Sequence, residues 1–301
     1  MRQGTEVRFS GAVDATPHTR GSTAGPSVQR EALEALAAMV RRGNVVVLTG
    51  AGMSTDSGIP DYRGPDGKRR VTPMTYGEFV TSAPGRQRYW ARSYVGWRRF
   101  RSARPNVSHH AVAELERRGL SRTVITQNVD ELHQKAGARE VIELHGTLDR
   151  VVCLTCGEAY RRDDIQAWLT EANPGFDQAA GGSIRPDGDV DLPPEAIDGF
   201  RAPRCLLCGE DQLKPDVVFF GESVPKPLVA QCFDHVEQCS GVLVLGSSLA
   251  VMSGYRFVRR AHRLGIPVAI VTRGWSRGDG EATVRLDAPL GETLTGLLEL
   301  V

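Results

Sequence analysis

Short apolar runs recur along the chain, and most of them are followed by glycine or by polar residues. The first run, over residues 45–48, comes after a helix-patterned stretch over 28–42 that Gly43 ends. Further runs occupy residues 122–126, 141–144, 216–220, 241–245 and 266–271. Strands that are apolar on both faces are typical of parallel sheets covered by helices. The pattern therefore predicts a doubly wound, Rossmann-like α/β domain.

Two segments interrupt this alternation. Residues 65–120 show helical spacing, with Trp90, Tyr94 and Trp97 on one stripe, and residues 149–213 contain four of the six cysteines. The chain is therefore expected to have four parts. They are a flexible leader (1–27), a Rossmann-like domain (28–64, 121–148 and 214–301), a helical module (65–120) and a small cysteine-containing module (149–213).

The overall composition narrows the classes of function. A formal net charge of +1 gives the chain no general attraction for nucleic acid or membranes. No apolar run approaches the roughly 20 residues of a membrane-spanning helix. Residues 1–30 also lack the apolar segment of a secretory signal. We therefore expect a cytoplasmic protein that does not enter membranes, and we expect it to be a monomer.

Arginine and aromatic residues alternate between positions 86 and 104. A nucleic-acid-binding surface is one interpretation of this stretch. The helical spacing of the aromatic residues favours instead an amphipathic helix with an apolar face and a solvated basic face. Nucleic acid is therefore not the partner we expect. A third interpretation is that one of the arginines meets an acidic group of a substrate.

Four cysteines form two C-x-x-C pairs, Cys153 with Cys156 and Cys205 with Cys208. Four thiolates in two chelating pairs suit a closed, tetrahedral zinc site, which predicts one structural Zn²⁺ in the small module. Redox-active dithiols are the alternative. The other two cysteines, Cys232 and Cys239, lie at helical spacing among apolar residues, so we expect them to be buried core thiols.

A loop rich in small residues follows the first predicted strand and is expected to lead into a helix. Gly50, Ala51, Gly52 and Ser54 would let backbone N–H groups approach a pyrophosphate at the positive end of that helix. The spacing is not G-x-G-x-x-G, and a tight packing turn is the alternative. The polar, aromatic and cationic residues that follow at 61–63 favour a nucleotide site.

Polar residues also follow three other predicted strands, at 127–130, 145 and 246–248. Ligands of open α/β sheets bind beyond the carboxyl ends of the strands, so these positions are candidate site residues. His145, with Gly146 leaving space beside it, is a candidate general base. Asn128 and Asp130 could bind ribose hydroxyls or a carboxamide, with ordinary turn chemistry as the alternative.

These motifs, taken together, resemble the sirtuins in order and spacing. The similarity covers about residues 30 to 300 and includes the segments 50–63, 126–130, 143–146, 214–222 and 246–248 and the paired cysteines. Segments 83–92, 94–97, 186–189 and 253–256 further resemble the class II branch of that family. The resemblance implies an NAD-dependent protein-lysine deacylase. Such an enzyme transfers the acyl group of a protein or peptide lysine to ADP-ribose and releases nicotinamide.

The resemblance also implies roles for individual residues. His145 would deprotonate a ribose hydroxyl, with Asn128 as the second catalytic residue. Asp130 would hold the nicotinamide carboxamide, and Gln127 and Asn128 would hold the ribose. Tyr62 and Arg63 would belong to a mobile loop that closes over NAD, and Asp61 would contact NAD as well. The other expected NAD contacts are Gly50, Ala51, Gly52, Ser54, Gly246, Ser247, Ser248, Thr272, Arg273, Gly274 and Leu290. The segment expected to pair with the substrate peptide consists of Val218, Phe219, Phe220 and Gly221.

Several alternatives stay open at this point. The same cleavage of NAD would serve a mono-ADP-ribosyltransferase, and a non-catalytic module that senses NAD or binds nucleic acid is a further possibility. The chain departs from many relatives at residues 252–254, where they carry proline, and at 272–274, where they often carry asparagine. The preferred acyl group is open, although Tyr89 and Arg92 resemble a pair that reads succinyl-lysine in another branch.

Overall fold

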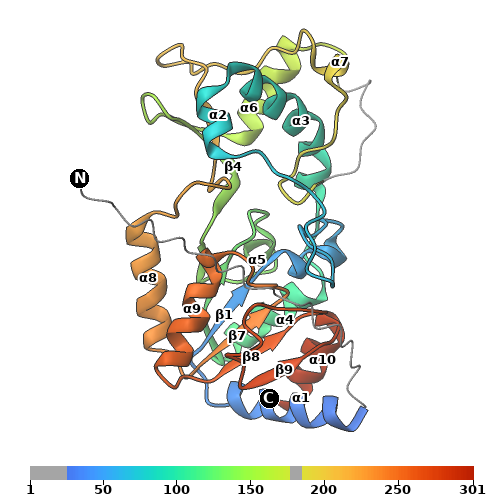
Figure 1. The fold of residues 1–301 in the computed structure, drawn as a ribbon, viewed down its shortest axis with the longest axis vertical. Coiled ribbons are helices and arrows are strands. Elements are labelled where there is room, and N and C mark those ends of the chain that lie inside the picture. The colour runs from blue at the N-terminus through green and yellow to red at the C-terminus, as the bar shows by residue number, and fades with distance from the viewer. Residues whose placement is uncertain (1–25, 177–184) are drawn as a thin grey trace, which may run out of the picture.

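The computed structural model describes residues 26–176 and 185–301, and these form a larger and a smaller lobe (Figure 1). The predicted leader lies outside the described residues, except for its last two, which begin helix α1 (Pro26–Val40). Residues 177–184 of the expected cysteine-containing module (149–213) are outside them as well.

The larger lobe is built on a six-stranded sheet with the order β3-β2-β1-β7-β8-β9, in which all neighbouring strands are parallel. This arrangement confirms the predicted α/β fold. The chain builds β2 and β3 on one side of β1 and later β7 to β9 on the other, so the topological switch lies between β1 and β7. The strands are β1 (Val45–Thr49), β2 (Ser121–Thr126), β3 (Val141–Glu143), β7 (Gly241–Leu245), β8 (Val268–Val271) and β9 (Val284–Leu286).

Helices cover both faces of this sheet because alternate strand residues point to opposite sides. On one face Val45 and Val47 pack with residues of α1, α4 (Val107–Arg117) and α10 (Leu290–Leu300). On the other face Val46 and Leu48 pack with residues of α8 (Lys226–Glu237) and α9 (Met252–Arg263). A short helix, α5 (Leu132–Lys135), follows β2. Two apolar cores, one on each face, therefore hold the sheet.

The smaller lobe, called the small domain below, combines helices with a three-stranded antiparallel sheet of order β5-β4-β6 (Figure 1). Trp90, Tyr94, Val151, Ile165 and Leu213 belong to its core. The strands are β4 (Gly146–Cys153), β5 (Ala159–Arg161) and β6 (Leu213–Val217), and the helices are α2 (Tyr76–Thr81), α3 (Ala83–Ser102), α6 (Arg162–Ala172) and α7 (Pro194–Ile197).

Two strand predictions need correction. The run at 216–220 was expected in the parallel sheet, but the strand there is β6, which ends at Val217 and pairs antiparallel with β4 in the small domain. Pro215 lacks a backbone donor, so this strand suits the edge position that it occupies beside β4. Strand β9 was not predicted at all, since it has only three residues and one of them is Arg285.

The loop after β1 also differs from the prediction. It forms two 3-10 turns, η1 (Ala51–Met53) and η2 (Thr55–Ser57), and no α-helix. Gly58 then adopts a left-handed conformation with φ of 84°, which ends the second turn. Serine and threonine favour such turns because their side chains compete for backbone hydrogen bonds, as Thr55 does with the carbonyl of Gly52 at 3.1 Å.

The arginine-aromatic stretch is helix α3, and its aromatic residues Tyr89, Trp90, Tyr94, Trp97 and Phe100 are all buried. The amphipathic interpretation is therefore confirmed for the apolar face. The basic face is only partly solvated. Arg86 is itself buried, and its guanidinium lies 2.8 Å from the Asp211 carboxylate.

The remaining expectations from composition can be compared with the described residues. Cys232 and Cys239 are buried in the core beside α8, as predicted. No helix in residues 26–176 or 185–301 is long and apolar enough to cross a membrane.

Candidate active site

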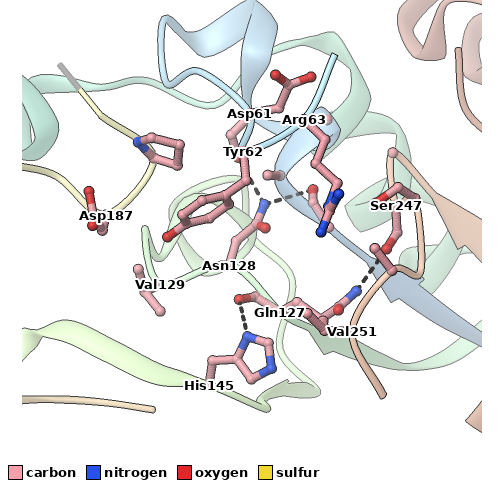
Figure 2. Close-up of a pocket in the computed structure, with 18 of the residues that line it drawn as sticks. Asp61, Tyr62, Arg63, Gln127, Asn128, Val129, His145, Asp187, Ser247 and Val251 are labelled. Carbon is pink, nitrogen blue, oxygen red and sulfur yellow. Dashed lines mark hydrogen bonds between the residues drawn. The ribbon is translucent and has the colours of Figure 1, made fainter. Parts of the chain in front are cut away.

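A cavity of about 970 Å³ lies at the carboxyl ends of β1, β2, β3 and β7 and is closed on the other side by the small domain. The large lobe contributes the strand ends, and the small domain contributes the segment 217–224 and residues such as Tyr89 and Asp187. Figure 2 shows side chains from these separate segments converging on the cavity.

His145 lies two residues after the end of β3, and both of its ring nitrogens have a partner. Figure 2 shows the hydrogen bond between the ring and Gln127. Nδ1 lies 2.9 Å from the carbonyl oxygen of Gln127, and Nε2 lies 2.8 Å from Oγ of Ser253. A carbonyl can only accept, so Nδ1 carries the proton and Nε2 presents its lone pair. Burial lowers the pKa of His145 to about 4. The ring is therefore neutral at physiological pH and able to accept a proton at Nε2.

Gly146 is needed for a reason other than the one expected. Its φ is 76°, and a Cβ atom there would lie 2.0 Å from the carbonyl oxygen of Asp216. The glycine therefore lets β4 approach β6, and the backbone N–H of Val218 donates to the His145 carbonyl at 2.9 Å. This close approach fixes the position of His145 between the two lobes.

The amide of Asn128 and the carboxyl of Asp130 form one hydrogen-bonded cluster. Asn128 Nδ2 donates to the Gly50 carbonyl at 3.0 Å and to Ser54 Oγ at 3.1 Å. Ser54 Oγ donates in turn to Asp130 Oδ2 at 2.6 Å. Burial raises the pKa of Asp130 above its ordinary value. Both amide hydrogens of Asn128 are used by the protein, which leaves its carbonyl oxygen to meet a ligand.

The loops after β1 and β7 meet at the topological switch. Gly52 N–H donates to the Gly246 carbonyl at 2.9 Å, and a Cβ atom on Gly52 would lie 2.9 Å from that oxygen. Gln127 Nε2 bridges to the Thr49 carbonyl at 3.1 Å and to Ser247 Oγ at 3.0 Å. Small residues are therefore required here for the two loops to touch, as the packing interpretation proposed. The same loops line the cavity, as the nucleotide interpretation proposed.

Residues 61–70 form a small hairpin over the cavity, with Arg63 paired to Arg69 in an isolated β-bridge. Asp61 accepts from Arg70 at 3.1 Å. The Tyr62 ring points into the cavity, while Arg63 points to the opposite side of Asn128 (Figure 2). Tyr62 also packs edge-on against Phe220, with ring centroids 5.6 Å apart. The expected cofactor loop and the expected peptide segment therefore touch.

The cavity brings together nearly all of the residues expected from the sequence. Gly274 does not line it, although Thr272 and Arg273 do. The lining residues are Gly50, Ala51, Gly52, Ser54, Asp61, Tyr62, Arg63, Gln127, Asn128, Asp130, His145, Val218, Phe219, Phe220, Gly221, Gly246, Ser247, Ser248, Thr272, Arg273 and Leu290. Their individual roles stay predictions.

Sequence reasoning missed other lining residues, among them Asp187, Ser253, Arg256 and Trp275. The available signals were the resemblance of segments 186–189 and 253–256, which include Asp187, Ser253 and Arg256, to the class II branch, and the departure from many relatives at residues 252–254. Tyr89 and Arg92 do not act as a pair at the cavity. Tyr89 lines it, whereas the Arg92 guanidinium lies 3.0 Å from Asp189 and bonds to the Val190 carbonyl.

The four paired cysteines lie outside the cavity and form one cluster in the small domain. Their Sγ atoms are all within 4.8 Å of one another, and Cys153–Cys208 and Cys156–Cys205 are each 3.6 Å apart. Tetrahedral zinc, with Zn–S bonds of about 2.3 Å, needs sulfurs at about this separation. None of the four is in a disulfide. The donor set therefore fits a closed structural zinc site and leaves no open position for catalysis.

The fold and the site together define a class. Its members are α/β enzymes that bind a dinucleotide at the carboxyl ends of the parallel strands and carry a small zinc-binding domain. Residues 50–253 match the Sir2 family, and the chain belongs to that family. This confirms the resemblance to sirtuins.

Similar proteins agree with this assignment. NAD-dependent protein deacetylase 1 of Streptomyces coelicolor is 55% identical over 264 residues, which cover 87% of this chain and 88% of the relative. NAD-dependent protein deacylase Sirt4 of Drosophila melanogaster is 47% identical over 265 residues, covering 87% and 84%. A solved complex described as Sir2, p53 peptide and NAD+ superposes with a TM-score of 0.70 at 29% identity, covering 89% of this chain and 97% of that one.

Proposed function

We propose that this protein is an NAD-dependent protein-lysine deacylase. One observation carries the proposal: a neutral histidine, His145, faces the same cavity as the two touching loops at the topological switch. Both relatives named above are described as a deacetylase or a deacylase, which does not favour a mono-ADP-ribosyltransferase or a non-catalytic module.

The residues present fit NAD. The cavity offers a free amide carbonyl on Asn128, the buried carboxyl of Asp130 and the backbone of two loops that small residues keep accessible. When bound, NAD supplies a ribose carbon from which nicotinamide leaves and an acceptor for the acyl group. Asp130 and Asn128 would hold the nicotinamide end, and the loops at Gly50 and Gly246 the phosphates.

His145 would act as the general base at Nε2. The proton taken from a hydroxyl would leave the ring positively charged, and the Gln127 carbonyl bonded to Nδ1 would stabilise that charge. Burial makes the neutral ring the resting state, so the base is ready without prior deprotonation.

The segment 218–221 would bind the peptide beside the Tyr62 ring. Four of its backbone groups are already used. Val218 N–H donates to the His145 carbonyl, Phe219 N–H donates to the Glu222 carboxylate, and the carbonyls of Phe219 and Phe220 accept from the backbone of Glu222 and Tyr76. Strand-like pairing with a peptide would therefore use other groups of the segment. The acyl chain would pass from this segment toward His145 and the Asn128 cluster.

The proposal extends to setting and partners. We propose a cytoplasmic monomer that acts on acyl-lysine proteins or peptides and does not use nucleic acid. Light scattering of the purified protein and fractionation of cells that express it test the first two points. A dimer, or enrichment in a membrane or secreted fraction, would contradict them.

Nicotinamide release tests the activity. The protein is incubated with NAD and a panel of acetyl-, succinyl- and hydroxymethylglutaryl-lysine peptides, and we expect release that depends on peptide for at least one acyl group. Absence of such release across the panel would overturn the deacylase. With radiolabelled NAD, acid-stable label on protein would instead identify an ADP-ribosyltransferase.

A further inference from the structure

We propose that Ser253 is a positioning residue for His145, holding the imidazole by a hydrogen bond to the nitrogen that accepts the proton. The inference rests on the proposed function, because it concerns the same reaction. It starts from the segment 252–254, where the chain departs from many of the sirtuins it resembles.

The direction of the hydrogen bond follows from the two partners of the ring. Nδ1 must donate to the Gln127 carbonyl, so Nε2 has no proton to give. Ser253 Oγ, 2.8 Å from Nε2, is therefore the donor. The hydroxyl occupies the position where a substrate hydroxyl would give up its proton, and it offers the same chemistry.

The first turn of α9 is packed so that this contact is fixed. Gly254 is buried, and a Cβ atom there would lie 2.7 Å from Oε1 of Gln127. Gln127 is itself anchored through Nε2 to Ser247 Oγ and the Thr49 carbonyl. The helix therefore fixes the side chain of Gln127. The backbone carbonyl of Gln127 holds one side of the His145 ring, and the helix places Ser253 on the other side.

Together these contacts fix both the tautomer and the orientation of the ring. The Gln127 carbonyl sets the proton on Nδ1, and the Ser253 hydroxyl keeps Nε2 aimed into the cavity until a ligand hydroxyl takes its place. Ser253 neither gains nor loses a proton overall in this role. The positive end of α9 and Arg256, one turn further along the helix, both disfavour a charged imidazole and act in the same direction.

Steady-state kinetics with NAD and an acyl-lysine peptide test the role. We expect Ser253→Ala to lower kcat by roughly three- to tenfold, the range that one hydrogen bond accounts for. KM for NAD should stay unchanged, because the ring and not the cofactor loses a contact. Ser253→Thr keeps the hydroxyl and should recover most of the rate. Tyr255→Phe is the matched control, since it removes a hydroxyl that bonds to Glu281 from the same helix and lies outside the cavity lining.

Wild-type kcat in Ser253→Ala would overturn the inference. So would an equal loss in Ser253→Thr or in Tyr255→Phe, which would indicate a general effect of the helix. Ser253 is only half-buried, so the alanine variant should fold, and its melting temperature checks this.

Nitrogen NMR of protein labelled with ¹⁵N-histidine separates this inference from the proposed function. The His145 signals are identified by their loss in His145→Gln. We expect an unprotonated Nε2 signal that shifts in Ser253→Ala, whether or not the protein turns over any acyl peptide. An unshifted Nε2 signal would overturn the contact itself, whereas a shift without any deacylation would leave the contact intact and refute the deacylase.

Discussion

The two lobes are stabilised in different ways. In the larger lobe, β1 and β7 are buried along their whole length, and two separate apolar cores cover the faces of the sheet. In the small domain the sheet has three strands, and its central strand β4 is only partly buried. The cysteine cluster joins the end of β4 to the turn before β6. A large sheet needs no metal for its stability, whereas a small one gains a cross-link from it.

The difference also separates the tasks of the two lobes. The large sheet places His145, Asn128 and Asp130 at strand ends that are fixed by parallel pairing. The small domain supplies the opposite wall, with Tyr89 and Asp187. Asn128 and Asp130 therefore sit on the large lobe and the substrate wall on the small domain that contains the cysteine cluster, while His145 lies at the junction of the two, just before β4.

Loss of the metal should have the largest effect. In the variant carrying both Cys156→Ser and Cys208→Ser, we expect zinc to fall from about one per chain to none and the small domain to unfold. Trp90, Trp97 and Trp168 belong to α3 and α6, so their fluorescence reports this domain. The helices of the large lobe should keep their circular dichroism. Deacylation should be lost with the substrate wall.

Cys232→Ala is the matched control for that variant. This thiol is buried in the large lobe, so its loss should lower stability modestly and leave zinc content unchanged. A zinc-free double variant with native tryptophan fluorescence would show that the small domain does not need the metal, and the contrast between the lobes would fail.

A cavity in the large sheet should have the next largest effect. Leu243 is 0% exposed at the centre of β7, and Leu243→Ala should lower the free energy of unfolding by about 2–5 kcal/mol. Leu206 lies between the ligands of the cysteine cluster and is 71% exposed, so Leu206→Ala should change it by less than about 0.5 kcal/mol. Urea unfolding of both variants, followed by circular dichroism, measures the two values. Equal changes would contradict the two-core description.

Two buried histidines of the large lobe should lose their contribution to stability in mild acid, before the catalytic histidine is protonated. His109 and His133 face each other in this lobe with ring centroids 5.0 Å apart, and burial lowers their pKa values to about 3 and about 4. The folded state excludes the charged rings, so their contribution is complete above the ordinary pKa of about 6.5 and is lost as pH falls toward the lowered values. These two rings should contribute a drop of about 1–3 kcal/mol between pH 7.5 and 5.5. Burial lowers the pKa of His145 in the same direction, whereas burial raises the pKa of Glu143 to about 7 and that of Asp189 to about 8, and these two carboxyls act in the opposite direction.

Urea unfolding at the two pH values, with excess zinc present, measures this drop. His262→Gln is the control, because that histidine is exposed and its replacement should leave the pH dependence as it is. The variant carrying both His109→Gln and His133→Gln should lose this contribution and differ from wild type in its pH dependence. The same pH dependence in both proteins would mean that the two buried rings are not kept neutral by the fold.

The parts that the sequence predicted well are those with local patterns. Residues 45–48 and 241–245 are apolar on both faces and are central strands, and His145, Asn128 and Asp130 follow strands in the chain itself. The paired cysteines have their spacing in the sequence. Each of these features depends on neighbours along the chain, so a single sequence contains the signal.

The parts that were missed depend on contacts between distant segments. Ser253 reaches His145 across 108 positions, and no local pattern marks it as a partner of the ring. The apolar run at 216–220 is typical of a strand. The pairing with β4 instead places the strand at residues 213–217, so the rest of the run follows the strand and lines the cavity. Arg285 interrupts the apolar pattern of β9, so the sequence does not indicate a strand there. An edge strand tolerates such a charge, but the edge position of β9 is set by the order of the whole sheet.

The most direct test of the account is a product analysis by mass spectrometry with NAD and an acyl-lysine peptide. We predict equal amounts of free-lysine peptide, nicotinamide and acyl-ADP-ribose. His145→Ala should lower the rate by roughly 10²–10⁴-fold, whereas His110→Ala, at an exposed position of α4, should keep the wild-type rate. Deacylation without acyl-ADP-ribose, or a His145→Ala variant as active as wild type, would contradict the account.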